Sequence, residues 1–89
     1  MTSHTTERFR KAYQDLPSEI KQKARKAYIL WKKNPWHKSL RFKKVHSSKP
    51  IYSVRIDINY RAVGVQTGDY IIWFWVGPHD EYMRLISQL

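Results

Sequence analysis

The stretch that decides the fold runs from Ile51 to Tyr82 and reads IYSVRIDINYRAVGVQTGDYIIWFWVGPHDEY. Apolar and polar residues alternate over 52–57 and 60–65, which predicts two antiparallel strands joined by a short connection. A tight hairpin turn at 67–69 leads into a third segment, residues 70–76, that is apolar on both faces. A strand of this kind is typical of the middle of a sheet that is covered on both sides.

The residues before this stretch predict two helices. Thr5 or Thr6 can cap a first helix that runs to about Leu16. Pro17 suits the first turn of a second helix, whose apolar residues keep helical spacing to about Lys33. Because the joint between the two helices is so short, we expect them to form a helical hairpin.

The remaining segments complete the expected topology. Over 40–45 the apolar residues recur about every second position, which indicates a further strand. Residues 80–86 indicate a short terminal helix. Residues 1–5 are expected to be disordered. The sequence therefore predicts one α+β domain over residues 1–89, in which the helical hairpin packs on a four-stranded, mainly antiparallel sheet.

Charge is distributed unevenly along the chain. The net charge is +10, but residues 1–49 contain fourteen Lys or Arg and three Asp or Glu (+11), whereas residues 50–89 contain three and four (−1). So large a basic surplus in a small domain predicts a polyanionic partner, which is nucleic acid, a ribosome or an acidic protein. A basic surface that serves solubility alone is the alternative.

Composition also excludes several classes of protein. The chain has no Cys, so disulfides and thiolate metal sites are excluded. No apolar run approaches the roughly 20 residues of a membrane span, and the N-terminal residues lack the apolar core of a signal peptide. We therefore expect a cytoplasmic protein that has no membrane partner.

Two arginines are the first candidates for chemistry. Arg55 and Arg61 lie on neighbouring predicted strands with a short turn between them, so an antiparallel pairing can bring them together. The planar guanidinium group donates two parallel hydrogen bonds to a phosphate, and two such groups can stabilise the extra charge of a pentacoordinate phosphorus. The alternative is a structural pairing with Asp57 or Asp69.

His79 and Tyr82 follow the last predicted strand. Histidine can take or give a proton at neutral pH, so His79 is a candidate general acid or base. Tyr82 lies three residues further on and can stack on a base or donate its hydroxyl group. The alternatives are a surface histidine in a turn and a tyrosine that packs in the core.

A basic, aromatic stretch between the helices and the central strands predicts RNA binding. Phosphate contacts beside a stacking ring are typical of proteins that bind single-stranded RNA. The alternative is a solvated edge strand guarded by lysines. A metal site is not expected, because the four histidines are scattered and no carboxylate cluster accompanies them. The predicted RNA-binding or ribosome-binding residues are Trp36, Lys38, Arg41, Lys43, Lys44 and Lys49.

Taken together, these segments resemble a known family. The relevant segments are Leu16-Pro17 at the helical joint, Asn34-Pro35 after the second helix, and the runs YSVR at 52–55, NYRA at 59–62 and WFWVGPHDEY at 73–82. Over almost the whole chain this pattern resembles the RelE/ParE superfamily of toxins from bacterial type II toxin–antitoxin systems. The resemblance implies a fold like that of microbial ribonucleases.

In the RelE-like branch, the resemblance implies cleavage of messenger RNA in the ribosomal A site without a metal or any other cofactor. The RNA 2′-hydroxyl attacks the adjacent phosphate and leaves a 2′,3′-cyclic phosphate and a 5′-hydroxyl. By position, Arg55 and Arg61 would hold the phosphate, His79 would be the general acid or base, and Tyr82 would stack or support. Lys43 and Lys44 would orient ribosomal RNA.

The sequence also departs from the family pattern. Ser53 stands where some members carry a second lysine, and residues 20–80 contain no Glu, so the carboxylate base of certain relatives is missing. The acidic Asp80 and Glu81 beside His79 favour a role as proton donor, which leaves the group that accepts the 2′-hydroxyl proton unassigned.

The resemblance implies partners and leaves alternative targets open. The expected partners are the ribosome, its messenger RNA and a cognate antitoxin whose acidic segment covers the basic surface in a hetero-oligomer. One alternative is a ParE-like toxin that poisons DNA gyrase without nuclease chemistry. A second alternative is a degenerate member that only binds its antitoxin. Fold alone does not choose among these functions.

Overall fold

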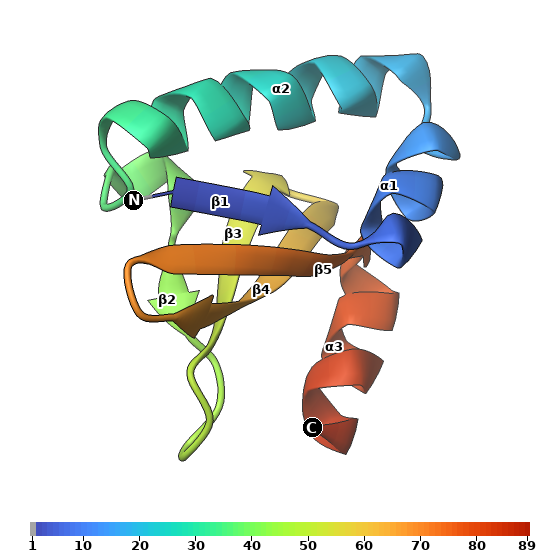
Figure 1. Ribbon diagram of the computed structural model, residues 1–89. Helices are drawn as coiled ribbons and strands as arrows, with labels where there is room; N and C mark the ends of the chain where they lie inside the picture. The colour runs from blue at the N-terminus through green and yellow to red at the C-terminus, as the bar shows by residue number, and fades with distance from the viewer. Residues whose placement is uncertain (1) are drawn as a thin grey trace.

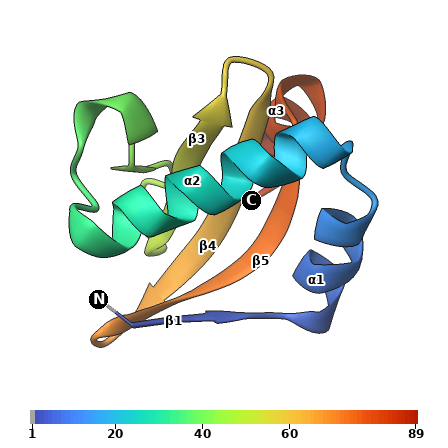
Figure 2. The same ribbon diagram turned by 90° about the horizontal axis from the view of Figure 1, so that it is seen from above.

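The computed structural model describes residues 2–89, which form one mixed sheet with helices on both faces. The strands lie in the order β1-β5-β4-β3-β2, and every neighbouring pair is antiparallel except β1 and β5, which run parallel. Figures 1 and 2 show α1 and α2 on one face and α3 on the other. In chain order the elements are β1 (Thr2–Thr5), α1 (Glu7–Gln14), α2 (Ser18–Lys33), the 3₁₀ helix η1 (Lys38–Leu40), β2 (Lys43–Lys44), β3 (Ile51–Asp57), β4 (Tyr60–Thr67), β5 (Tyr70–Pro78) and α3 (His79–Gln88).

The predicted α+β class is confirmed, but the sheet has five strands where four were expected. The additional strand is β1, from a segment that was predicted to be disordered; that prediction is wrong for Thr2–Thr5, while residue 1 lies outside the described residues. Thr2 lies opposite Tyr70 and Thr5 opposite Trp73, so β1 satisfies backbone groups along an otherwise open edge of β5. A short polar strand of this kind has no apolar alternation by which the sequence could reveal it.

The prediction of a strand over 40–45 is wrong for the first part of that range. Residues 38–40 form η1, because the Nδ1 atom of His37 accepts a hydrogen bond from the backbone N–H of Ser39 at 3.2 Å. Arg41 then adopts a left-handed conformation with φ of 46°, which turns the chain. Lys43 and Lys44 alone pair with β3, opposite Ser53 and Tyr52.

Local chemistry explains where the long helices begin. The Oγ1 atom of Thr6 accepts a hydrogen bond from the N–H of Phe9 at 3.1 Å and caps α1, as the sequence predicts. Pro17 immediately precedes α2. The two helices follow each other through a short joint, but α1 packs against β5 whereas α2 lies across β3. None of the helices within residues 2–89 is long and apolar enough to cross a membrane.

The sheet separates two apolar cores. The larger core lies under α1 and α2 and contains Trp31, Val54 and Trp73, while the smaller one lies under α3 and contains Val63 and Tyr82. Strands β4 and β5 are therefore covered on both faces, which confirms the prediction for residues 70–76 of β5 and adds β4 to it. A small irregularity in the pairing of β4 with β5 falls between Val63 and Gly64.

Candidate active site

Arg55 and Arg61 lie directly opposite each other on β3 and β4. A two-residue turn at 58–59 joins the strands and places Asp57 opposite Tyr60, and a register shift between Arg55 and Asp57 then brings Arg55 opposite Arg61. Alternating residues of β3 and β4 face the same side, and Ser53 contacts α3 on that side, so both arginines are on the α3 face. The predicted proximity of the two arginines is confirmed. Like charges directly opposite each other destabilise a sheet, so a structural role does not explain this pair.

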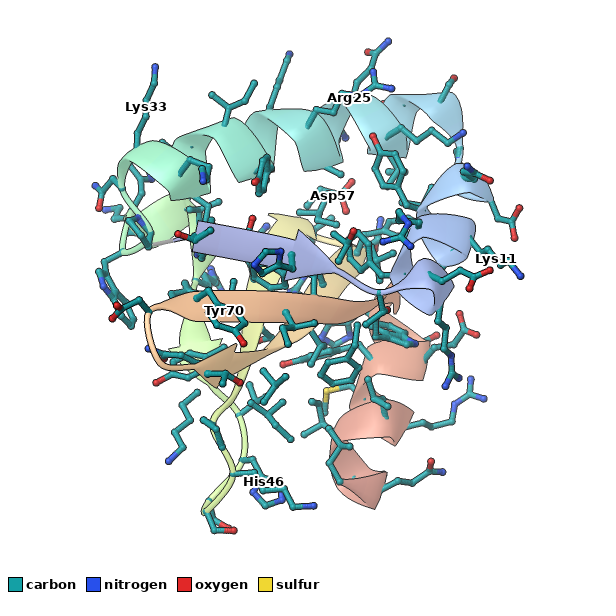
Figure 3. All side chains as sticks on the ribbon, viewed as in Figure 1. Lys11, Arg25, Lys33, His46, Asp57 and Tyr70 are labelled. Atoms are coloured by element: carbon teal, nitrogen blue, oxygen red, sulfur yellow. The ribbon has the colours of Figure 1, made fainter. Side chains whose placement is uncertain are left out.

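The expected alternative partners of the arginines are engaged elsewhere or distant. Asp57 pairs with Lys23 of α2 at 3.3 Å and accepts a hydrogen bond from the N–H of Asn59 at 2.9 Å. Figure 3 places Asp57 on the side of the sheet that faces α2. Within residues 2–89, no carboxylate lies at ion-pair distance from Arg55 or Arg61. The α3 face therefore carries two guanidinium groups that form no ion pair with a described acidic side chain.

Arg61 is anchored by the turn that precedes it. Its Nη1 atom donates hydrogen bonds to the backbone carbonyl of Asp57 at 2.5 Å and to that of Tyr60 at 3.0 Å. Partial burial lowers the pKa of Arg61, and the nearby charges of Arg55 and Arg41 lower it further. Arg55 and Arg41 therefore both repel Arg61, an effect that the charge of Asp57 partly offsets. An anion bound among them would relieve that repulsion.

His79 stands beside this cluster at the start of α3. Its backbone N–H donates to the carbonyl of Asn59 at 2.7 Å, and the register of β4 and β5 places Arg61 opposite Gly77. The imidazole ring is half-buried and lies 5.7 Å from the ring of Tyr82. The structure thus brings Arg55, Arg61 and His79 to one end of the α3 face. Within residues 2–89, no three His, Asp or Glu side chains gather as a metal ion would require.

Tyr82 occupies a different environment from the one that a stacking residue needs. Its side chain is only 5% exposed, and its hydroxyl group donates to the Oγ of Ser53 at 3.0 Å. Ser53 is itself 2% exposed, so the hydrogen bond is buried. The prediction that Tyr82 stacks on a base is therefore wrong for this structure. The other predicted role, support, fits, because the hydrogen bond ties α3 to β3 below His79.

The predicted RNA-binding residues do not form one surface. Lys43 lies opposite Ser53 and so faces the α3 side, whereas Lys44 lies opposite Tyr52, which packs against the core under α1 and α2. Trp36 is 64% exposed, but its ring lies 4.9 Å from Phe42 of that same core. Lys38, Arg41 and Lys49 are exposed in η1 or in the connections around β2. Among these residues, Arg41 and Lys43 are the ones that the structure places beside the arginine pair or on its face.

One feature of Arg41 could not be found in the sequence. It is the non-glycine residue with positive φ among residues 2–89, and this conformation is sparsely populated by residues with a side chain. Such strain often accompanies function. Its charge acts on Arg61, so it extends the cationic cluster from β3 and β4 towards β2.

Comparison with known proteins identifies the family to which this fold belongs. Residues 18–84 match the family model described as the ParE-like toxin domain. The chain belongs to that family. The ParE-like domain is accordingly a toxin of the RelE/ParE superfamily, as the sequence pattern indicates. A comparison with curated protein sequences finds no match.

Solved structures share the fold of this ParE-like domain at low sequence identity. RelE in the RelB–RelE antitoxin–toxin complex from Methanococcus jannaschii superposes with a TM-score of 0.74 at 19% identity, covering 92% of this chain and 96% of that one. YafQ from E. coli strain BL21(DE3) gives 0.72 at 14% identity, with coverage of 90% and 94%. The YoeB/ParE toxin from Agrobacterium tumefaciens gives 0.69 at 16% identity, with coverage of 89% and 99%. These similarities establish the fold.

Proposed function

We propose that this ParE-like domain is the toxin of a type II toxin–antitoxin system and cleaves messenger RNA on the ribosome without a metal, which inhibits translation in the cytoplasm. One observation carries the proposal: Arg55 and Arg61 lie opposite each other, without an acidic partner among the described residues, beside His79. Two such guanidinium groups suit a phosphate that gains negative charge in the transition state.

The reaction is a transfer within the RNA. The 2′-oxygen forms a bond to phosphorus, and the bond between phosphorus and the 5′-oxygen breaks. The proton lost from the 2′-hydroxyl is balanced by a proton gained at the 5′-oxygen, so the products are a 2′,3′-cyclic phosphate and a 5′-hydroxyl. Arg55 and Arg61 stabilise the pentacoordinate phosphorus, and His79 exchanges one of the two protons. Tyr82 holds α3, and therefore His79, in position through Ser53.

The proposed partners are the ribosome with its messenger RNA and a cognate antitoxin. Solved structures with this fold include RelB–RelE and DinJ–YafQ complexes, in which the toxin is bound to its antitoxin. The net charge of +10 supports an acidic antitoxin segment and a ribosomal RNA surface as partners. Arg41 and Lys43 extend the cationic face along which the RNA backbone would lie.

A cleavage assay on translating ribosomes tests the proposal. Purified protein is added to ribosomes that hold a defined messenger, and primer extension locates new ends. We expect cuts in the A-site codon, and fragments whose free 5′-hydroxyl a kinase labels without prior phosphatase treatment. Arg61→Ala and His79→Ala should each reduce the rate by a factor of about 10² or more. Arg8→Ala, on exposed α1, is the matched control and should cut at the parental rate.

The second candidate is a toxin that poisons DNA gyrase. The description of the matching family names ParE, and the arginine cluster contains no carboxylate that could act as base. Purified protein that inhibits gyrase supercoiling without cutting ribosome-bound messenger would replace the first proposal with this one. Growth arrest that persists in both Arg61→Ala and His79→Ala cells would also refute the nuclease mechanism. A chain that does not cut messenger RNA, does not inhibit gyrase and does not arrest growth would be a member that only binds its antitoxin.

A further inference from the structure

The turn between β3 and β4 contacts both Arg61 and His79. The Nη1 atom of Arg61 donates to the backbone carbonyls of Asp57 and Tyr60, at 2.5 and 3.0 Å. The carbonyl of Asn59, in the same turn, accepts the N–H of His79 at 2.7 Å. The backbone of this turn therefore holds a guanidinium group of the candidate site and the first residue of α3. A movement of the turn would displace both.

Asp57 is the side chain that fixes this turn. One carboxylate oxygen, Oδ1, accepts the N–H of Asn59 at 2.9 Å, which closes the turn on itself. The other, Oδ2, lies 3.3 Å from the Nζ atom of Lys23 in α2. The Asp57 side chain is 16% exposed, and Figure 3 shows it on the side of the sheet that faces α2. One carboxylate thus connects α2 to the turn that holds Arg61 and His79.

Other restraints on the turn are weaker. The pairing of β3 with β4 shifts in register between Arg55 and Asp57, and the hydrogen-bond ladder is locally disrupted at such a shift. Ile58, at the tip of the turn, is 68% exposed, so apolar packing does not hold it. Because the ladder is interrupted on one side and the tip is not packed, the position of the turn depends on the two contacts of the Asp57 carboxylate.

We propose that Asp57 is a positioning residue for RNA cleavage: its carboxylate, held by Lys23, sets the turn that aims Arg61 at the phosphate. The same turn fixes the start of α3 and therefore His79. This inference rests on the proposed function. Neither Asp57 nor Lys23 touches the RNA, because their ion pair lies on the α2 side of the sheet and the arginine pair on the α3 side. Their effect on cleavage therefore passes through the turn.

Positioning and RNA binding have different kinetic signatures. A lysine that contacts a phosphate contributes to affinity, so its loss raises KM and reduces the salt dependence of cleavage. Loss of a positioning contact leaves binding in place and lowers kcat, because the phosphate then meets a misplaced guanidinium group. Lys23 is basic and 45% exposed, yet we expect Lys23→Met to lower kcat and to leave KM within about threefold of the parental value.

The experiment measures cleavage of a defined messenger on the ribosome with three variants. Asp57→Ala removes both contacts of the carboxylate and should lower kcat by a factor of about 10 to 100. Asp57→Asn keeps an oxygen for the N–H of Asn59 and should recover part of that loss. Lys23→Met removes the ion pair and leaves the bond to Asn59 in place. Because a partly exposed ion pair contributes little to stability, Lys23→Met should remain folded.

Two matched controls lie on α2. Lys26 is exposed on this helix and forms no ion pair among the described residues, so Lys26→Met should cut at the parental rate. Glu19→Gln removes the other ion pair of Lys23, at 3.7 Å, and should also cut at the parental rate. If Lys23 acts through Asp57, the double variant Lys23→Met/Asp57→Asn should cut no more slowly than the slower single variant.

The amide of His79 gives a readout that does not depend on cleavage. Its N–H donates to the carbonyl of Asn59, so a displaced turn should accelerate its hydrogen exchange. We expect exchange faster by a factor of about ten in Asp57→Ala, and a smaller increase in Lys23→Met. The amide of Val63, which is buried in β4, should keep its parental rate and so distinguish a local movement from a loss of global stability.

Several results would overturn the inference. These are a parental kcat in both Asp57→Ala and Lys23→Met, a change confined to KM, equal losses in Lys23→Met and Lys26→Met, additive losses in the double variant, or exchange that accelerates equally at Val63 and His79. A parent chain that does not cut RNA refutes the proposed function. In that case, faster exchange at His79 alone still supports the role of Asp57 in placing the turn, and parental exchange refutes it.

Discussion

Replacement of Tyr82 by Phe separates the two roles that a tyrosine in this position can have. The Tyr82→Phe change keeps the ring and removes the hydroxyl that donates to Ser53 Oγ at 3.0 Å. Both side chains are at most 5% exposed, so the change leaves a buried serine hydroxyl without its partner, which costs about 1–3 kcal/mol. For a domain of this size, each kcal/mol lowers the melting temperature by roughly 4–8 °C.

A double-mutant cycle measures the contact directly. Ser53→Ala should destabilise the fold by a similar amount, because it leaves the buried tyrosine hydroxyl unpaired. The double variant replaces both partners by apolar groups, so it should cost less than the sum of the single changes by about 1 kcal/mol. Urea denaturation of the parent, the two single variants and the double variant gives the four free energies of unfolding, and thermal unfolding provides an independent check.

Cleavage by the same variants decides the role of Tyr82. If Tyr82 supports α3, Tyr82→Phe should cut at nearly the parental rate at temperatures well below its melting point. Loss of cleavage by a factor of about 10² with an unchanged free energy of unfolding would refute the supporting role. That result would mean that the hydroxyl leaves Ser53 to take part in the chemistry.

Three further predictions test other parts of the fold. Sulfate should bind the arginine cluster and raise the melting temperature, because at ten times its dissociation constant it adds about 1.4 kcal/mol to the free energy of unfolding. Arg55→Gln should reduce this effect, and equal shifts of the melting temperature in both proteins would contradict the prediction. Gly64→Ala should lower the free energy of unfolding by about 1–3 kcal/mol, because a Cβ there would lie 2.9 Å from a side-chain carbon of Trp73 and 3.0 Å from the backbone oxygen of Ile72. An unchanged urea midpoint of unfolding would show that these neighbours move freely. Thr6→Ala should cost about 1 kcal/mol by removal of the α1 cap, whereas Thr6→Ser should restore most of it.

Residues close together in the sequence account for most of what could be predicted. The closeness of Arg55 and Arg61 follows from the short turn between their strands, whereas their direct opposition depends on a register shift between Arg55 and Asp57 that the sequence does not reveal. The start of α1 follows from a threonine cap. The inward direction of Tyr82 was also readable, because Tyr82, Leu85 and Ile86 share helical spacing and all pack in the core under α3.

What could not be predicted depends on distant contacts. Strand β1 exists because β5 offers it an edge more than sixty residues further along the chain, and its own residues carry no pattern. The left-handed Arg41 follows a 3₁₀ turn that is stabilised by the His37 side chain, and neither residue type predicts that geometry. The engagement of Asp57 by Lys23 likewise required α2 to be placed over β3.

The division of the interior by the sheet has a consequence for how such a toxin can evolve. Residues that face α3 pack in the core that contains Val63 and Tyr82, and residues that face α1 and α2 pack in the core that contains Trp31 and Trp73. A substitution on one face of the sheet therefore meets different neighbours from a substitution on the other face. A duplicated copy can accumulate changes in one core while the other core keeps its packing.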